Sequence, residues 1–194
     1  MKIKKLCLTL IASSFFSIPM AYGMEDDTQR QVVQVKPKIE GRLEELKIKL
    51  PTPAKTATSF VPFKIIDNMV YISGQLPVCD GTLLYKGKLG REFKIHEGQK
   101  AAKLCTYNIL AYLKEACDGD LDRVQECVRL GVWVNSTDDF EDQPKVANAA
   151  TDLINAIFGE NGLHVRAAVG SNSLPFRAAV EIDAIFVLKK MSKL

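Results

Sequence analysis

Apolar side chains recur at three- and four-residue steps in two long segments of the chain. The first segment is Glu97–Cys117, and the second runs from Pro144, a residue favoured in the first turn of a helix, to a stop at Gly159. This spacing predicts two amphipathic helices, each with one buried face. A shorter run with the same spacing, Arg42–Leu50, predicts a third helix that is ended by Pro51.

Apolar and polar side chains alternate in other segments, and this alternation predicts strands with one buried face. The predicted strands are Met69–Ile72, Val124–Val134, His164–Val169 and Ala179–Leu188, with a hairpin turn at Asp80–Gly81 that leads into Thr82–Tyr85. These strands are too few to form two packed sheets, and the two amphipathic helices need a surface to cover. The order of elements therefore predicts an α+β domain, with one sheet and both long helices on one of its faces.

The composition of the 194 residues is that of a globular protein, with 47% hydrophobic and 25% charged side chains. It excludes a disordered chain, a collagen and a membrane protein with several spans. Three of the 26 basic residues and none of the 23 acidic residues lie in positions 1–23, so the rest of the chain is formally neutral. A neutral chain gives no support to strong nucleic-acid binding.

The beginning of the chain has the three parts of a secretory signal peptide. A basic part ends at Lys5, an apolar part is Leu6–Phe16, and a stretch of small residues ends at Gly23. The apolar part is shorter than the about 20 residues that a membrane span needs; a buried N-terminal helix is the alternative. We predict a signal peptide over 1–23, export to the periplasm or the medium, and no membrane attachment after cleavage. Residues 24–41 are then a flexible leader, and 42–190 the folded domain.

Export changes the interpretation of the cysteines, because disulfides persist outside the cytosol. Without Cys7, the chain keeps Cys79, Cys105, Cys117 and Cys127. Four cysteines allow three full pairings, and buried free thiols are at least as good a hypothesis. With two histidines and no Cys-x-x-Cys, the sequence does not indicate a metal site. It also has no Gly-x-Ser-x-Gly, Walker or dinucleotide-binding motif, so neither a serine hydrolase nor a nucleotide cofactor is indicated.

Two charged side chains interrupt apolar strands near the end of the chain. Arg166 lies in a run of small and apolar residues, where a buried guanidinium needs an anionic partner. Its planar fork can hold a carboxylate through two hydrogen bonds. Glu181 similarly interrupts the last predicted strand. Either these two residues pair with one another or face solvent, or Arg166 binds the carboxylate of a small ligand.

Several short blocks follow one another between Arg42 and Lys189. They are Val70–Pro77 (VYISGQLP), Gly87–Gly90 (GKLG), Glu97–Ala102 (EGQKAA), Gly119–Val124 (GDLDRV), Val132–Asn135 (VWVN) with Asp139–Phe140, then Arg166, and Leu174–Pro175 with Val180–Ile182. Each block is common by itself, but the set in this order resembles the Rid family, the reactive intermediate deaminases also named YjgF or endoribonuclease L-PSP proteins. The blocks GKLG and FGxxGxHxR resemble a long subgroup of that family.

The resemblance implies a chorismate-mutase-like α+β fold, with a mixed sheet and two helices on one face. It also implies a homotrimer that has a ligand cleft at each subunit interface. Family members of the archetypal kind hydrolyse small enamines and imines, such as 2-aminoacrylate, to a 2-keto acid and ammonia without a cofactor. An imine carbon is already electrophilic, so a fixed carboxylate and a positioned water suffice for this chemistry.

Matching by position, the resemblance also implies the site residues. Arg166 matches an arginine that clamps the substrate carboxylate, and Glu181 matches a glutamate that positions water or moves protons, so these two are the catalytic candidates. The substrate-binding candidates are Ser73, Asn148, the backbone of Ala168, and Phe60 or Phe63. Ala168 stands where the family has a cysteine, and the phenylalanine stands where a tyrosine often lines the cleft.

Three functions remain after the sequence analysis. The first is an enamine or imine deaminase that uses Arg166 and Glu181. The second is an exported binding module that holds a small carboxylate in the same cleft without catalysis. The third is a ribonuclease, against which the formally neutral chain argues.

Overall fold

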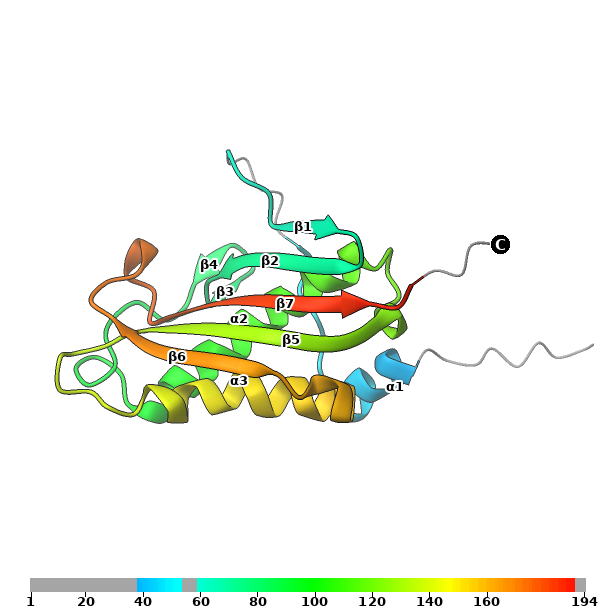
Figure 1. Ribbon diagram of the computed structural model, residues 1–194. Coiled ribbons are helices and arrows are strands. Elements are labelled where there is room, and N and C mark those ends of the chain that lie inside the picture. Colours follow the sequence, from blue (N-terminus) through cyan, green and yellow to red (C-terminus); the bar gives the residue numbers. More distant parts are fainter. Residues whose placement is uncertain (1–37, 54–58, 191–194) are drawn as a thin grey trace, which may run out of the picture. The chain divides into compact units, whose positions relative to one another are not determined.

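Figure 1 shows the computed structural model of the chain, which describes residues 38–53 and 59–190. Five strands form one sheet in the order β1-β2-β7-β5-β6. Their bounds are β1 Phe63–Ile66, β2 Met69–Gln75, β5 Val124–Asn135, β6 Val165–Ser171 and β7 Val180–Leu188. A two-stranded ribbon consists of β3 Val78–Cys79 and β4 Thr82–Leu83. The helices are α1 Lys38–Glu45, α2 Ile95–Ala116 and α3 Gln143–Phe158, with 3-10 turns η1 Leu121–Arg123, η2 Gly159–Gly162 and η3 Pro175–Arg177.

The two long helices, α2 and α3, cover one face of the sheet (Figure 1). Helix α2 packs against β2 and β7, whereas α3 packs against β5 and β6. Strands β5 and β6 are parallel and α3 connects them, as a parallel pair requires a crossover. The pairs β1–β2, β2–β7 and β7–β5 are antiparallel. The predicted α+β fold, a mixed sheet with two long helices on one face, is confirmed.

The core lies between the helices and one face of the sheet. Along β7, the even-numbered residues from Val180 to Leu188 are buried against the helices. Glu181 and Asp183 are half-buried on the opposite face, because successive side chains of a strand point to opposite faces. We call this opposite face, which neither long helix covers, the outer face of the sheet.

The first helix differs from its prediction in position. It spans Lys38–Glu45 instead of the predicted 42–50, so residues 38–41, predicted as the end of a leader, are helical. The cause is a cap from a distant part of the chain, since both carboxylate oxygens of Asp122 accept hydrogen bonds from the backbone N–H groups of Lys38 and Ile39, at 2.7 and 2.8 Å. The helix ends before Lys47, which has a left-handed φ of 55°.

Strand β1 was not predicted from the sequence, whereas the hairpin turn was. Phe63 of β1 is half-buried and its other three residues are exposed, so no alternating pattern marks this edge strand. The turn at Asp80–Gly81 is confirmed, because Cys79 pairs with Thr82 across it. Both turn residues have positive φ values, 48° and 75°, which is the geometry of a type I′ hairpin turn.

All four cysteines in the described part of the chain, Cys79, Cys105, Cys117 and Cys127, are free thiols. Cys79 is half-buried and the other three are buried. Burial raises the pKa of Cys117 to about 11 and that of Cys127 to about 12, and it raises the pKa of Cys105 well above its ordinary value. Buried, protonated thiols are poor nucleophiles, so among these four described cysteines only Cys79 lies where a reagent can reach it.

We therefore expect Cys79 alone to react rapidly with Ellman's reagent in the native Cys7→Ser protein. The other three cysteines are expected to react only after unfolding in guanidinium, because burial keeps them protonated and inaccessible. Stopped-flow absorbance measures the fast amplitude, and adding Cys79→Ser should remove it. Fast modification of two or more thiols per chain would contradict this expectation.

The predicted signal peptide, residues 1–23, lies outside the described residues, as does most of the predicted leader. Within 38–53 and 59–190, no helix is long and apolar enough to cross a membrane.

Candidate functional site

Arg166 lies in β6, at the edge of the sheet. The sequence suggested that the cation of Arg166 is buried here, and the structure leaves it only half-buried. Val165 and Val169 are 67% and 44% exposed on the outer face, and Arg166 itself is half-buried. An edge strand has a paired neighbour on one side only, so a run of small and apolar residues in it does not require burial.

The guanidinium of Arg166 is held by α3. Its Nη1 atom donates hydrogen bonds to Oδ1 of Asn148 and to Oγ1 of Thr151, both at 2.9 Å. Residues three apart lie on the same side of a helix, so both acceptors face β6 together. Two hydrogen bonds use both hydrogens of Nη1, whereas no described carboxylate pairs with the side chain. The edge of the guanidinium formed by Nε and Nη2 makes no hydrogen bond to a described residue.

Ala168 lies two residues after Arg166 and points to the same side of β6. It is half-buried and packs against the edge of the core. Three of the predicted site residues, Arg166, Asn148 and Ala168, are therefore brought together where β6 meets α3. We call these three residues the β6 group.

Glu181 lies on the outer face, near the beginning of β7. Its carboxylate reaches over Gly74 of β2, where the methyl group of an alanine would lie only 2.1 Å from Oε1. An alanine at this position would therefore force the side chain of Glu181 to move. A register shift of β2 against β7 between Ile72 and Gln75 places Gly74 there.

Burial raises the pKa of Glu181, and the like charge of Asp183 raises it further. Asp183 follows two residues later on the same face, where its Oδ1 accepts a 2.7 Å hydrogen bond from Nη1 of Arg129. Burial also raises the pKa of Asp183, although Arg129 acts in the opposite direction. Glu181 therefore keeps its proton to a higher pH than an ordinary glutamate does.

Replacing Asp183 by asparagine is expected to lower the pKa of Glu181. The change removes a negative charge and frees the cation of Arg129, and both effects favour ionised Glu181. The side-chain ¹³C NMR titration of Glu181 measures its midpoint without an assay of function. Asp67→Asn, an exposed change in the turn between β1 and β2, is the matched control and should leave the midpoint unchanged. A midpoint that stays constant or rises in Asp183→Asn would refute this account of the pKa.

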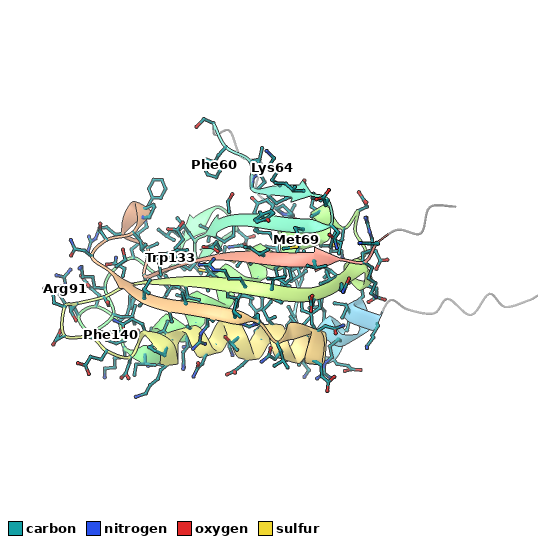
Figure 2. The ribbon with its side chains drawn as sticks, in the orientation of Figure 1. Phe60, Lys64, Met69, Arg91, Trp133 and Phe140 are labelled. Carbon is teal, nitrogen blue, oxygen red and sulfur yellow. The ribbon has the colours of Figure 1, made fainter. Side chains whose placement is uncertain are left out.

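Ser73 and Phe60 lie near Glu181 rather than near Arg166. The hydroxyl of Ser73 donates a 2.8 Å hydrogen bond to the carbonyl of Val61, which ties β2 to the segment before β1. Phe60 is 58% exposed, and Figure 2 shows it beside this segment, away from β6. With Gly74, Phe60 lines a cavity of about 430 Å³ between β2, α2 and the β3–β4 ribbon. We call Glu181, Ser73 and Phe60 the β7 group.

Arg166 of the β6 group and Glu181 of the β7 group lie on different faces of the sheet in one protomer. Arg166 is in register with Leu130 of β5, which is fully buried on the helix side. Glu181 is in register with Trp133 of β5, which is half-buried on the outer face. The suggestion that Arg166 and Glu181 pair with one another is therefore wrong within a protomer. The structure does not bring the two catalytic candidates into one cleft of a single chain.

Sequence reasoning missed the other polar and aromatic residues of the outer face. A methyl group on Gly131 of β5 would lie 2.6 Å from Oδ2 of Asp183 and 2.7 Å from the indole of Trp133. Gly131 therefore makes room for both side chains, which approach it on the outer face. Figure 2 labels Trp133 on the sheet. Only the alternation of β7 pointed to Asp183, and no local pattern pointed to its partner Arg129.

The described residues contain no group of three or more His, Cys, Asp or Glu side chains that could hold a metal ion.

One mixed sheet with two long helices on one face, and with β5 and β6 joined by α3, defines the class as a chorismate mutase-like α+β protein. A model of the YjgF/chorismate mutase-like family, whose description also refers to endoribonucleases, matches residues 40–186. The chain therefore belongs to the YjgF family, which is also called the Rid or L-PSP family.

Individual relatives agree with this assignment. Protein TCP17 of Trypanosoma cruzi is 43% identical over 152 residues, which are 78% of this chain and 94% of that protein. The crystal structure of Atu1372 from Agrobacterium tumefaciens is 46% identical, with a TM-score of 0.73 over 78% of this chain and 92% of that one. A structure from Shewanella oneidensis is 33% identical, with a TM-score of 0.75 over 78% of this chain and 99% of the other.

Proposed function

We propose that this protein hydrolyses small enamines and imines that carry a carboxylate. In the imine form, water adds to the C=N carbon and the C–N bond then breaks, which gives a 2-keto acid and ammonia. The reaction transfers protons but no electrons, so it needs no redox cofactor.

The observation that carries the proposal is the hydrogen-bonding pattern of the Arg166 guanidinium. Asn148 and Thr151 occupy both hydrogens of Nη1, so the hydrogens of the side-on edge formed by Nε and Nη2 are unused by described residues. This edge matches the two oxygens of a carboxylate, and such paired, charge-assisted hydrogen bonds are among the strong ones in proteins. Arg166 can thus fix a substrate by its carboxylate and leave the adjacent C=N group free to react.

Glu181 is suited to the proton transfers of the same reaction. Because its pKa is raised, the carboxyl group can be protonated at a higher pH than usual and donate a proton to the imine nitrogen or to the departing amine. Once ionised, it can accept a proton from the attacking water. Both steps require Glu181 and Arg166 to face one substrate, which a single protomer does not allow.

The site is therefore proposed to form between two copies of the chain, with the β6 group of one copy facing the β7 group of the next. A head-to-tail contact forms a ring when its rotation closes, and we propose that it does so here as a homotrimer. Exposed apolar side chains support the contact: Tyr71, Val165 and Val169 are 42%, 67% and 44% exposed on the outer face. Such a surface is typical of one that a partner covers.

Hydrolysis of freshly generated 2-iminopropionate tests the proposed reaction. We expect the purified protein to release pyruvate and ammonia faster than buffer does. No acceleration would overturn the proposal, and binding of 2-ketobutyrate without acceleration would favour a binding module instead. RNA cleavage that depends on Arg166 would favour the ribonuclease.

We also propose that residues 1–23 direct export, on the basis of their sequence alone. N-terminal sequencing of the protein recovered from its native host tests this. A new N-terminus near residue 24 in the periplasmic or secreted fraction is expected, and an intact Met1 in the cytosolic fraction would overturn it.

A further inference from the structure

We infer that Thr151 and His164 are positioning residues, which hold the guanidinium of Arg166 so that its free edge is presented to the substrate carboxylate. The inference rests on the proposed function, because it assigns these two residues a part in the same site. Neither residue belongs to the set that the resemblance to the family implied.

The inference begins with a chain of hydrogen bonds that leads from the backbone to Arg166. The carbonyl oxygen of Gly162 lies 2.6 Å from Nδ1 of His164, and Nε2 of His164 lies 3.3 Å from Oγ1 of Thr151. Oγ1 of Thr151 in turn lies 2.9 Å from Nη1 of Arg166. Together these three hydrogen bonds connect η2, α3 and β6.

The chemistry of the two groups in each hydrogen bond decides which of them donates. A carbonyl oxygen only accepts, so Nδ1 of His164 carries a hydrogen and donates to Gly162. In the neutral ring this leaves Nε2 as an acceptor, and Thr151 donates its hydroxyl hydrogen to it. The oxygen of Thr151 then has its lone pairs free to accept from Arg166. A histidine in this tautomer therefore orients the hydroxyl as an acceptor for the guanidinium.

The backbone of Gly162, at the start of this chain of hydrogen bonds, is held in place by packing. A methyl group on Gly162 would lie 2.7 Å from the carbonyl oxygen of Ile154 in α3, so only glycine permits this close approach. His164 and Arg166 are two residues apart and point to the same side, with Thr151 of α3 between them. The spacing of Gly162, His164 and Arg166 in the block GxHxR is thus explained by this geometry.

Holding the Arg166 side chain in place before a ligand arrives should strengthen ligand binding. A free arginine loses rotamer entropy when it binds a ligand, whereas an arginine already held by the protein loses less. Asn148 fixes one hydrogen of Nη1, and Thr151 fixes the other and with it the plane of the group. Losing Thr151 should therefore weaken carboxylate binding while the charge of Arg166 remains.

The test compares Thr151→Val, which keeps the shape and removes the hydroxyl, with Thr151→Ser, which keeps the hydroxyl. We expect Thr151→Val to raise the Kd for 2-ketobutyrate and the KM for 2-iminopropionate about 3- to 10-fold, with kcat nearly unchanged. Thr151→Ser should restore most of the affinity. Combining Thr151→Val with His164→Ala should add little to the larger single effect, because both act through one chain of hydrogen bonds.

Thr106→Val is the matched control, since the Thr106 hydroxyl bonds only the Ala102 carbonyl within α2. Its Kd should equal that of the wild type, and thermal unfolding should show every variant to be folded. An unchanged Kd in Thr151→Val, or a weakening that Thr151→Ser does not relieve, overturns the inference. If the Kd values change as expected but no imine is hydrolysed, the proposed reaction fails and the positioning role stands.

Discussion

Replacing Arg166 by alanine is expected to weaken imine hydrolysis and the binding of 2-keto acids strongly. The guanidinium is the proposed partner of the substrate carboxylate, and truncation would leave that carboxylate unpaired in the cleft. Losing one partner of a hydrogen-bonded charge pair costs about 2–5 kcal/mol, which corresponds to a loss of at least about 30-fold in kcat/KM. Calorimetric binding of 2-ketobutyrate and initial rates with 2-iminopropionate measure the two effects.

Two further variants complete this test. One separates the role of the planar guanidinium from that of its positive charge, and the other controls for nonspecific effects of removing an arginine. Arg166→Lys keeps a positive charge but cannot hold a carboxylate side-on, so we expect it to recover only a small part of the affinity. Arg91→Ala removes an exposed arginine that pairs with Glu92, and it should leave both measurements unchanged. Wild-type rates in Arg166→Ala would show that Arg166 does not bind the substrate.

Most of the fold was predictable because the long elements have clear periods. The apolar residues of α2, α3, β5 and β7 repeat at the spacing of their own element, and their order defines the class. Helix α1 was predicted at the wrong position because it depends on a distant partner, and strand β1 was missed because its sequence does not alternate between buried and exposed residues. Helix α1 begins where Asp122 caps it, and β1 exposes three of its four residues.

Less of the candidate site was predictable, because it depends on which face of an element each residue occupies. The sequence indicated Arg166 and Glu181 as unusual charges, but only the register of β6 and β7 against β5 shows that they face opposite ways. Arg166 donates a hydrogen bond to Asn148, which is another of the predicted site residues. The links from Arg129 to Asp183 and from His164 to Thr151 join separate elements, so no local pattern marks them.

Because Arg166 and Glu181 lie apart within one protomer, a large effect is also expected when two variants assemble together. If each site takes Arg166 from one copy and Glu181 from its neighbour, two inactive variants should restore activity when they assemble together. Arg166→Ala supplies an intact Glu181, and Glu181→Gln supplies an intact Arg166. A ring of mixed subunits then contains sites at which both intact residues meet. Random mixing at equal amounts should give about a quarter of the wild-type activity, since each site receives each intact residue half of the time.

Coexpression of the two variants, followed by purification through different tags on each, provides the mixed assemblies for a rate measurement with 2-iminopropionate. Each variant alone and a mixture of separately assembled variants serve as controls, and all three should be inactive. Recovery of activity in the coexpressed protein alone, to about a third of the wild-type activity because each mixed trimer has one complete site of three, is the result that the shared site predicts. Coexpressed assemblies that contain both chains and remain as inactive as either variant alone would contradict it.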